Sequence, residues 1–131
     1  MCGVLGIRAP ERDVARLAYF GLFALQHRGQ ESAGIAVADG KRLTALRDMG
    51  LVTQVFSEDK LSGLTGDAAI AHCRYSTTGS ASWGNAQPLV QRGRARTVAL
   101  GHNGNLTNTS DLRDELRARG VRLATTSDTE V

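Results

Sequence analysis

Only two of the 131 residues are cysteine, Cys2 and Cys73, and aromatic residues make up only 5% of the chain. Two cysteines do not build a disulfide framework, and a cytosolic protein would keep both of them reduced. So few aromatic side chains leave little surface on which nucleic-acid bases could stack. The basic residues behind the net charge of +3 are scattered, apart from a small cluster at Arg92, Arg94 and Arg96 that we interpret as a solvated loop. We therefore expect neither a disulfide-stabilised fold nor a nucleic-acid partner.

Long hydrophobic segments are missing as well. No apolar run approaches the ~20 residues that a membrane-spanning helix needs. The first apolar stretch, residues 4–7, is too short for the hydrophobic region of a signal peptide. We therefore expect no membrane partner and a cytoplasmic location.

Spacings typical of metal sites are also absent. The sequence contains no CxxC or HxxxH pattern. His72 and Cys73 are consecutive in a predicted strand, so their side chains should point to opposite faces of a sheet. We therefore predict no metal site in this chain, and we expect His27, His72 and His102 to be buried hydrogen-bonding groups.

The order of predicted elements indicates an α+β fold. Strands are predicted at residues 2–7, 34–38, 42–46, 68–75 and 97–102, and helices at 14–26, capped by Asp13, and at 110–119, stopped by Gly120. Short helical turns are expected between residues 51 and 64, one of them opening at Ser57, and a long loop is expected at 76–87. Because the strands come in hairpin-like pairs with helices between them, we predict mainly antiparallel sheet.

The last residues resemble the beginning of a helix. Ser127 is followed three residues later by Glu130, which is the spacing of a capping box. The chain ends one residue further on. We therefore expect residues 1–131 to be the N-terminal part of a single larger domain.

Cys2 is the first candidate for chemistry. Removal of Met1 would leave Cys2 with a free α-amino group, whose ordinary pKa of about 7.7–8.0 suits proton transfer near neutral pH. One residue would then supply both the nucleophilic thiol and its base, which is the logic of N-terminal nucleophile enzymes. A lone cysteine after an initiator methionine can equally be a chance start, so other motifs have to decide.

Six blocks of sequence favour a catalytic Cys2 over a chance start. They are residues 1–7, 25–34, 72–79, 85–88, 101–106 and 125–130. In this order and register they resemble the class II glutamine amidotransferase domain of the amidophosphoribosyltransferase family, over essentially the whole chain. The resemblance implies the αββα sandwich of N-terminal-nucleophile hydrolases, built of mainly antiparallel sheets and incomplete in this fragment.

The resemblance also implies roles for individual residues. Cys2 would attack the side-chain amide of glutamine, and the Asn103 side chain with the Gly104 N–H would stabilise the oxyanion. Arg74 would bind the substrate carboxylate and Asp128 its α-ammonium group. Arg28 and Gly29 would support the nucleophile, and the loop that begins near Arg74 would close over the substrate.

For the whole enzyme, the resemblance implies transfer of ammonia to phosphoribosyl pyrophosphate in purine biosynthesis, on a phosphoribosyltransferase domain that this chain lacks. It also implies a homotetramer, Mg²⁺ and, in some members, a 4Fe–4S cluster, with no cofactor in this part. We expect little or no activity from residues 1–131 alone. Two alternatives remain: the glutaminase domain of another class II amidotransferase, and a non-catalytic binding module that retains the fold.

Overall fold

The main sheet has four antiparallel strands in the order β1-β4-β2-β3. The computed structural model describes residues 1–76 and 81–131. The strands are β1 (Gly3–Arg8), β2 (Ser32–Ala38), β3 (Leu43–Met49) and β4 (Ala68–Arg74). The register pairs Gly3 of β1 with Cys73 of β4, so the start of the chain lies beside the end of β4. This pairing brings the N-terminus next to Arg74.

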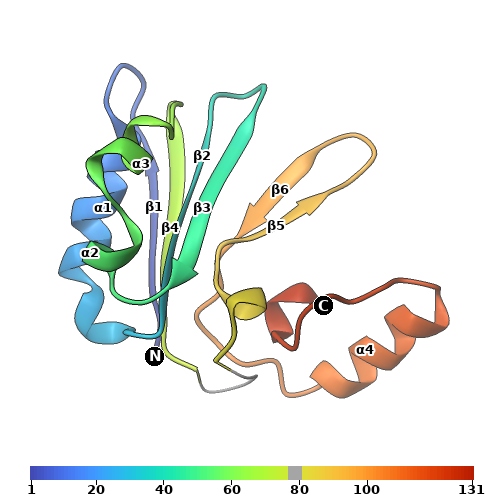
Figure 1. The fold of residues 1–131 in the computed structure, drawn as a ribbon. Helices are drawn as coiled ribbons and strands as arrows, with labels where there is room; N and C mark the ends of the chain where they lie inside the picture. Colours follow the sequence, from blue (N-terminus) through green and yellow to red (C-terminus); the bar gives the residue numbers. More distant parts are fainter. Residues whose placement is uncertain (77–80) are drawn as a thin grey trace.

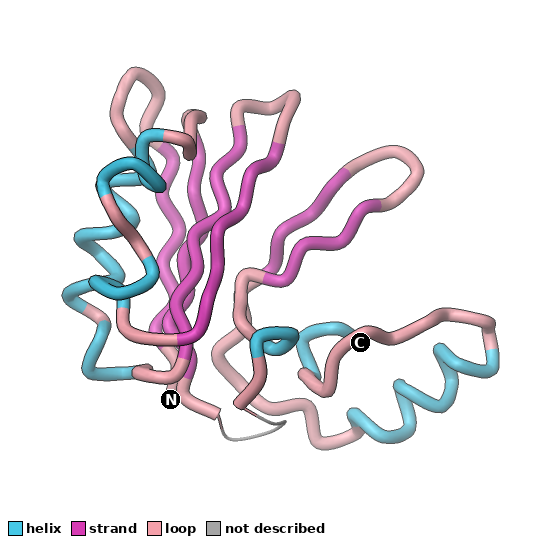
Figure 2. Tube along the Cα trace, in the orientation of Figure 1, coloured by secondary structure: helices cyan, strands magenta, loops and turns pink. Residues whose placement is uncertain are grey.

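Three helices cover one face of this sheet, as Figures 1 and 2 show: α1 (Val14–Ala24), α2 (Val52–Val55) and α3 (Glu58–Ser62). The Asp13 side chain accepts a hydrogen bond from the Arg16 N–H and so caps α1. Alternate residues of β2, Ala33, Ile35 and Val37, face these helices. With Leu22 of α1 they belong to the apolar core that fixes the sheet.

A second, two-stranded sheet lies on the other side, formed by β5 (Leu89–Arg92) and β6 (Thr97–Leu100). The chain continues into α4 (Thr109–Ala118), which ends before Gly120, whose φ is +79°. The described residues also form three short 3₁₀ turns: η1 (Gln26–Arg28), η2 (Trp83–Asn85) and η3 (Asp128–Glu130). The second sheet and the C-terminal turn lie together in Figure 1, apart from α1.

The predicted α+β class with antiparallel sheets is confirmed, as are the five strands, both helices and the helical turn that opens at Ser57. Three details differ. Residues 89–92 form a strand that the sequence did not predict, since it is short and pairs only with β6. The capping box is wrong: Ser127 accepts from the Thr129 N–H, while the Glu130 carboxylate accepts from the N–H groups of Ala124 and Thr125. The predicted loop at 76–87 contains η2, and its residues 77–80 lie outside the described part.

The helices of residues 1–76 and 81–131 include none with the length and hydropathy of a transmembrane span.

Candidate active site

A small polar cleft collects most of the residues that the sequence marked for chemistry. Its lining includes Cys2, Arg74, Gly104 and Asp128, from four separate parts of the chain. Its volume of about 20 Å³ is closer to the space of a single water than to the ~300 Å³ of an ordinary ligand pocket. The side chains therefore lie close together, and the cleft would have to widen to admit a substrate.

Cys2 lies just before β1, with its sulfur against the end of β4. The Sγ atom is 3.4 Å from the Tyr75 backbone nitrogen, which donates to it, and 3.5 Å from the Tyr75 carbonyl oxygen, to which the thiol donates. The Cys2 backbone N–H donates to Oδ1 of Asn103 at 3.1 Å. The thiol and the backbone nitrogen of Cys2 are thus both held by polar partners from distant segments.

Arg28 and Gly29 lie behind Cys2, Arg28 in contact with it and Gly29 against the end of β4. The Arg28 guanidinium donates through Nε to the Cys2 carbonyl oxygen at 3.1 Å. Gly29 packs directly on the backbone of β4: a Cβ at this position would lie 2.6 Å from the carbonyl oxygen of Cys73 and 2.6 Å from the carbonyl carbon of Arg74. Glycine is therefore required by the close approach of two backbones. The supporting role of both residues stays a prediction.

Arg74 is only 4% exposed and is paired with an acid that the sequence analysis did not single out. Its Nη1 lies 3.1 Å from Oε2 of Glu31. The same carboxylate accepts hydrogen bonds from the backbone N–H and the hydroxyl of Ser76. Burial raises the pKa of Glu31, but the Ser76 hydrogen bonds and the Arg74 charge outweigh it and hold that pKa below its ordinary value. Arg74 is therefore oriented by an ionised partner.

The acid Asp128 faces the segment that follows β6. Its Oδ2 accepts from the Leu106 N–H at 2.9 Å, and its Oδ1 lies 3.6 Å from Nδ1 of His102. Gly104 approaches the same histidine so closely that a Cβ would lie 2.5 Å from the His102 Nε2. The turn after β6 and the C-terminal turn thus meet around His102.

The histidines differ in their surroundings. His72 is fully buried in β4, and its Nε2 donates to the His102 carbonyl oxygen at 3.0 Å, while its buried Nδ1 has no hydrogen-bond partner among the described residues. Burial lowers the pKa of His72 to about 4, so its ring is neutral at pH 7. His102 is partly buried. The expectation was wrong for His27, which is exposed because it lies in η1 at the surface.

Cys73 is buried in β4, as predicted, and burial raises the pKa of its thiol. In the described part of the chain no group of three or more His, Cys, Asp or Glu side chains lies together as metal ligands would. The expectations for Mg²⁺ and an iron–sulfur cluster concern other parts of the enzyme and stay predictions.

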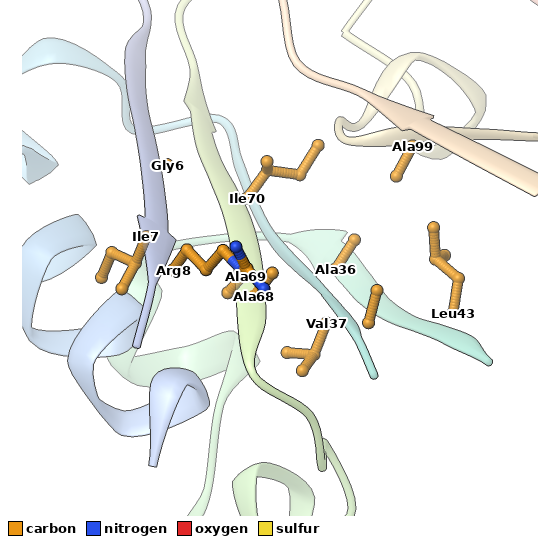
Figure 3. Close-up of a pocket in the computed structure, with 11 residues that line it drawn as sticks. Gly6, Ile7, Arg8, Ala36, Val37, Leu43, Ala68, Ala69, Ile70 and Ala99 are labelled. Atoms are coloured by element: carbon orange, nitrogen blue, oxygen red, sulfur yellow. The ribbon is translucent and has the colours of Figure 1, made fainter. Parts of the chain in front are cut away.

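A larger pocket of about 400 Å³ lies elsewhere, on the sheet face opposite α1. Figure 3 shows that Ile70, Ala36 and Leu43 line it together with Ala99 of β6. Its lining is almost entirely apolar, and it contains no nucleophile and no acid–base pair. Size alone therefore does not locate the chemistry, and the small polar cleft remains the candidate site.

Of the seven predicted site residues, Cys2, Arg74, Gly104 and Asp128 line the cleft and Asn103 contacts Cys2, with Arg28 and Gly29 behind. The sequence did not predict two residues at the site: Glu31, which pairs with Arg74, and Gln87, which lines the cleft. Both lie in blocks that carried the family resemblance, Gln87 within residues 85–88. Glu31 is one of 13 acidic residues with nothing local to single it out, and the amide of Gln87 does not titrate. The predicted loop closure falls partly on residues outside the described part.

Comparison with known proteins gives consistent results. Residues 57–131 match the family model described as "Glutamine amidotransferase domain". The chain is 57% identical over 130 residues to the amidophosphoribosyltransferase of Synechococcus elongatus, covering 99% of this chain and 26% of that protein.

Two solved structures are also similar. One, described as the structure of the allosteric regulatory enzyme of purine biosynthesis, has a TM-score of 0.90 and 44% identity over 99% of this chain and 28% of its own. The other, the glutamine phosphoribosylpyrophosphate amidotransferase from B. subtilis complexed with ADP and GMP, has a TM-score of 0.82 and 42% identity over 98% and 27%. The chain thus spans about a quarter of the length of the proteins that it matches.

Proposed function

The chain belongs to the glutamine amidotransferase domain family and has the N-terminal-nucleophile hydrolase fold, and from this premise we propose that it hydrolyses glutamine through a thioester on Cys2. The observation that carries the proposal is the cleft itself. A thiol, a buried guanidinium, a glycine after a strand and a buried carboxylate meet there from four segments. Attack on an amide requires a nucleophile and donors to the oxyanion, and recognition of an amino acid requires charged partners for its two ends.

The α-amino group acts as the base in this proposal. Once Met1 is removed, the Cys2 nitrogen becomes a primary amine beside Oδ1 of Asn103, the atom that the same nitrogen contacts at 3.1 Å. It takes the thiol proton, the sulfur forms a bond to the amide carbon, and the electron pair moves onto the amide oxygen. Collapse of this intermediate breaks the C–N bond, and the leaving nitrogen takes the proton as ammonia. Water then attacks the thioester, which releases glutamate.

The remaining groups stabilise and orient the substrate. The Asn103 amide and the Gly104 N–H donate hydrogen bonds to the oxyanion. Stabilisation of this kind is usually the largest single contribution to the rate of acyl transfer. Arg74 binds the α-carboxylate and Asp128 the α-ammonium group. A guanidinium offers several N–H donors in a fixed plane, a geometry that matches the two oxygens of a carboxylate.

The wider role is proposed from the relatives. Since relatives that share the whole of this chain are named amidophosphoribosyltransferases, we propose that the released ammonia reacts with phosphoribosyl pyrophosphate on another region of the complete enzyme. The product is phosphoribosylamine, for purine biosynthesis. The tetramer is part of the same proposal.

Covalent labelling tests the nucleophile. A diazo-ketone analogue of glutamine should add one label to the full-length protein, at Cys2, and glutamine should protect against it. Cys73 provides a matched control thiol, because it is fully buried and donates to the Leu25 carbonyl oxygen at 3.3 Å. Cys2→Ala should abolish labelling and ammonia release, while Cys73→Ala should preserve both. If Cys2 is not labelled, the result would instead favour a non-catalytic binding module that retains the fold.

Intact mass tests the base. Active protein should lack Met1. If protein with Met1 still attached released ammonia from glutamine at the full rate, an α-amino base would be excluded.

A further inference from the structure

Gln87 lines the cleft but has no part in the reaction as proposed. Its side chain is buried, at 4% exposure, and both ends of its amide are used. Oε1 accepts from the His102 backbone N–H at 2.7 Å, and Nε2 donates to Oγ1 of Thr129 at 2.8 Å. His102 directly precedes Asn103 and Gly104, and Thr129 directly follows Asp128. One side chain therefore joins the turn with the oxyanion donors to the turn with the carboxylate.

The backbone of Gln87 is itself fixed to the main sheet. Gly34 of β2 lies so close that a Cβ there would be 2.2 Å from the Gln87 carbonyl oxygen. Beside it, the Arg47 guanidinium of β3 donates to the Ala86 carbonyl oxygen and lies over the Trp83 ring at 4.9 Å. The amide thus extends from a rigid support toward two turns that have no strand pairing of their own.

A second amide on the same segment supports the C-terminal turn. Asn85, which is fully buried, donates through Nδ2 to Oγ1 of Thr126 at 2.7 Å and accepts from the Thr126 N–H at 3.1 Å. Asn85 therefore anchors the start of the turn that carries Asp128, and Gln87 anchors its end. Gln87 also contacts the turn after β6, through the His102 N–H.

We infer that Gln87 is a positioning residue that sets the distance between the oxyanion donors, Asn103 and Gly104, and the ammonium-binding carboxylate of Asp128. This rests on the proposed glutaminase function. A glutamine substrate carries its reacting amide and its α-ammonium group at opposite ends, so both turns must be held at one separation for both ends to be bound at once. A side chain with an acceptor at one atom and a donor at the other satisfies the fixed N–H of His102 and the hydroxyl of Thr129 together.

The test uses four variants of the full-length protein. Gln87→Met keeps the length of the side chain but removes both hydrogen bonds. Thr129→Val leaves the bond from Gln87 to His102 but removes the bond from Gln87 to the Asp128 turn, together with the bond that the Ser127 hydroxyl donates to Thr129. Thr129→Ser keeps the hydroxyl and so controls for both losses. Gln91→Met is the matched control, because Gln91 is an exposed residue of β5. Glutaminase kcat and KM are measured per active site, with the sites counted by stoichiometric diazo-ketone labelling.

Gln87→Met should lower kcat/KM for glutamine by roughly 10- to 100-fold, with a lower kcat and a higher KM, since a lost buried hydrogen bond changes an equilibrium by about tenfold. Thr129→Val should raise KM by roughly tenfold and change kcat by less than about twofold. Thr129→Ser and Gln91→Met should resemble the unmodified protein.

Two outcomes would overturn the inference. One is unchanged kcat and KM in Gln87→Met. The other is a loss that appears only as fewer labelled sites, with normal constants at each remaining site, because that would be a folding effect alone. Cys2→Ala, measured in parallel, separates this inference from the proposed function: if Cys2→Ala stays active the function itself fails, and if only Gln87→Met stays normal the positioning role fails.

Discussion

Substituting Gly29 with alanine should damage the site without touching any reacting group. Gly29 has φ −161° and ψ 129°, which is extended backbone that any residue can adopt, so the effect has to come from contact alone. The new methyl carbon would lie 2.6 Å from the Cys73 carbonyl oxygen and 2.7 Å from the Cys73 carbonyl carbon. These are backbone atoms of a paired central strand, and they cannot rotate away as a side chain would.

The size of the effect follows from that overlap. Carbon atoms pack comfortably at about 3.5–4.0 Å, so η1 and β4 would have to separate by about 1 Å. Overpacking of this kind typically costs about 1–3 kcal/mol of stability. Because Arg28 holds the Cys2 carbonyl and the end of β4 holds the Cys2 sulfur, the same separation pulls the two supports of the nucleophile apart.

The assay compares two glycine variants of the full-length protein. A Cβ on Gly6 of β1 would meet nothing within 4 Å, so Gly6→Ala is the matched control and should be neutral or stabilising by less than about 1 kcal/mol. Gly29→Ala should lower the midpoint of thermal unfolding and slow diazo-ketone labelling of Cys2. If both variants showed the same unfolding midpoint and the same labelling rate, the argument from backbone contact would be refuted.

Three further predictions concern charged groups. Glu31→Gln removes the charge that orients Arg74, so KM for glutamine should rise and the unfolding free energy should fall by about 1–3 kcal/mol; an unchanged KM in steady-state assays would contradict this. Asp128→Asn should raise KM roughly tenfold with little change in kcat, whereas Asp111→Asn, at an exposed position of α4, should do neither. Burial lowers the pKa of His72 from 6.5 to about 4, so on acidification the unfolded chain binds a proton at a higher pH than the folded chain does. The free energy of unfolding should therefore decline as the pH falls from about 6.5 to about 4, by about 3 kcal/mol at most. Chemical denaturation at several pH values measures this decline, and a His72→Gln variant that kept the same slope would assign it to other groups.

The sequence predicted the parts of the fold that are decided by local patterns. Asp13 caps α1 and Gly120 follows α4 at positive φ, because caps and stops depend on neighbouring residues only. The second strand of the outer hairpin, β6, was predicted, but its partner β5 was not. Residues 89–92 are too short and too polar at Gln91 and Arg92 to show a strand pattern, and pairing with β6 defines them.

The prediction of candidate site residues rests on a different kind of signal. Cys2, Arg74, Asn103, Gly104 and Asp128 were identified by the order of whole motifs. No local pattern reveals that Glu31 pairs with a residue 43 positions away, since that contact exists only once β2 and β4 are paired in register. Supporting residues whose partners are distant in sequence, such as Glu31, therefore escape single-sequence reasoning, whereas Arg28 and Gly29 were identified through a motif.

The cleft is held together by side chains outside the proposed chemistry. Each group proposed for chemistry is held by a side chain that does not react: Arg28 holds Cys2, Glu31 holds Arg74, and Gln87 joins the two turns that carry the remaining groups. All three supports extend from 3₁₀ turns, strands or segments fixed on the main sheet. The reacting groups meanwhile lie at strand ends and turns, which have few backbone partners of their own and would otherwise move independently. We therefore expect the separation between the thiol, the proposed oxyanion donors and the carboxylate to depend on the main sheet through these three side chains. Substitutions of the supports should then alter kinetic constants as much as substitutions of the groups proposed to bind glutamine.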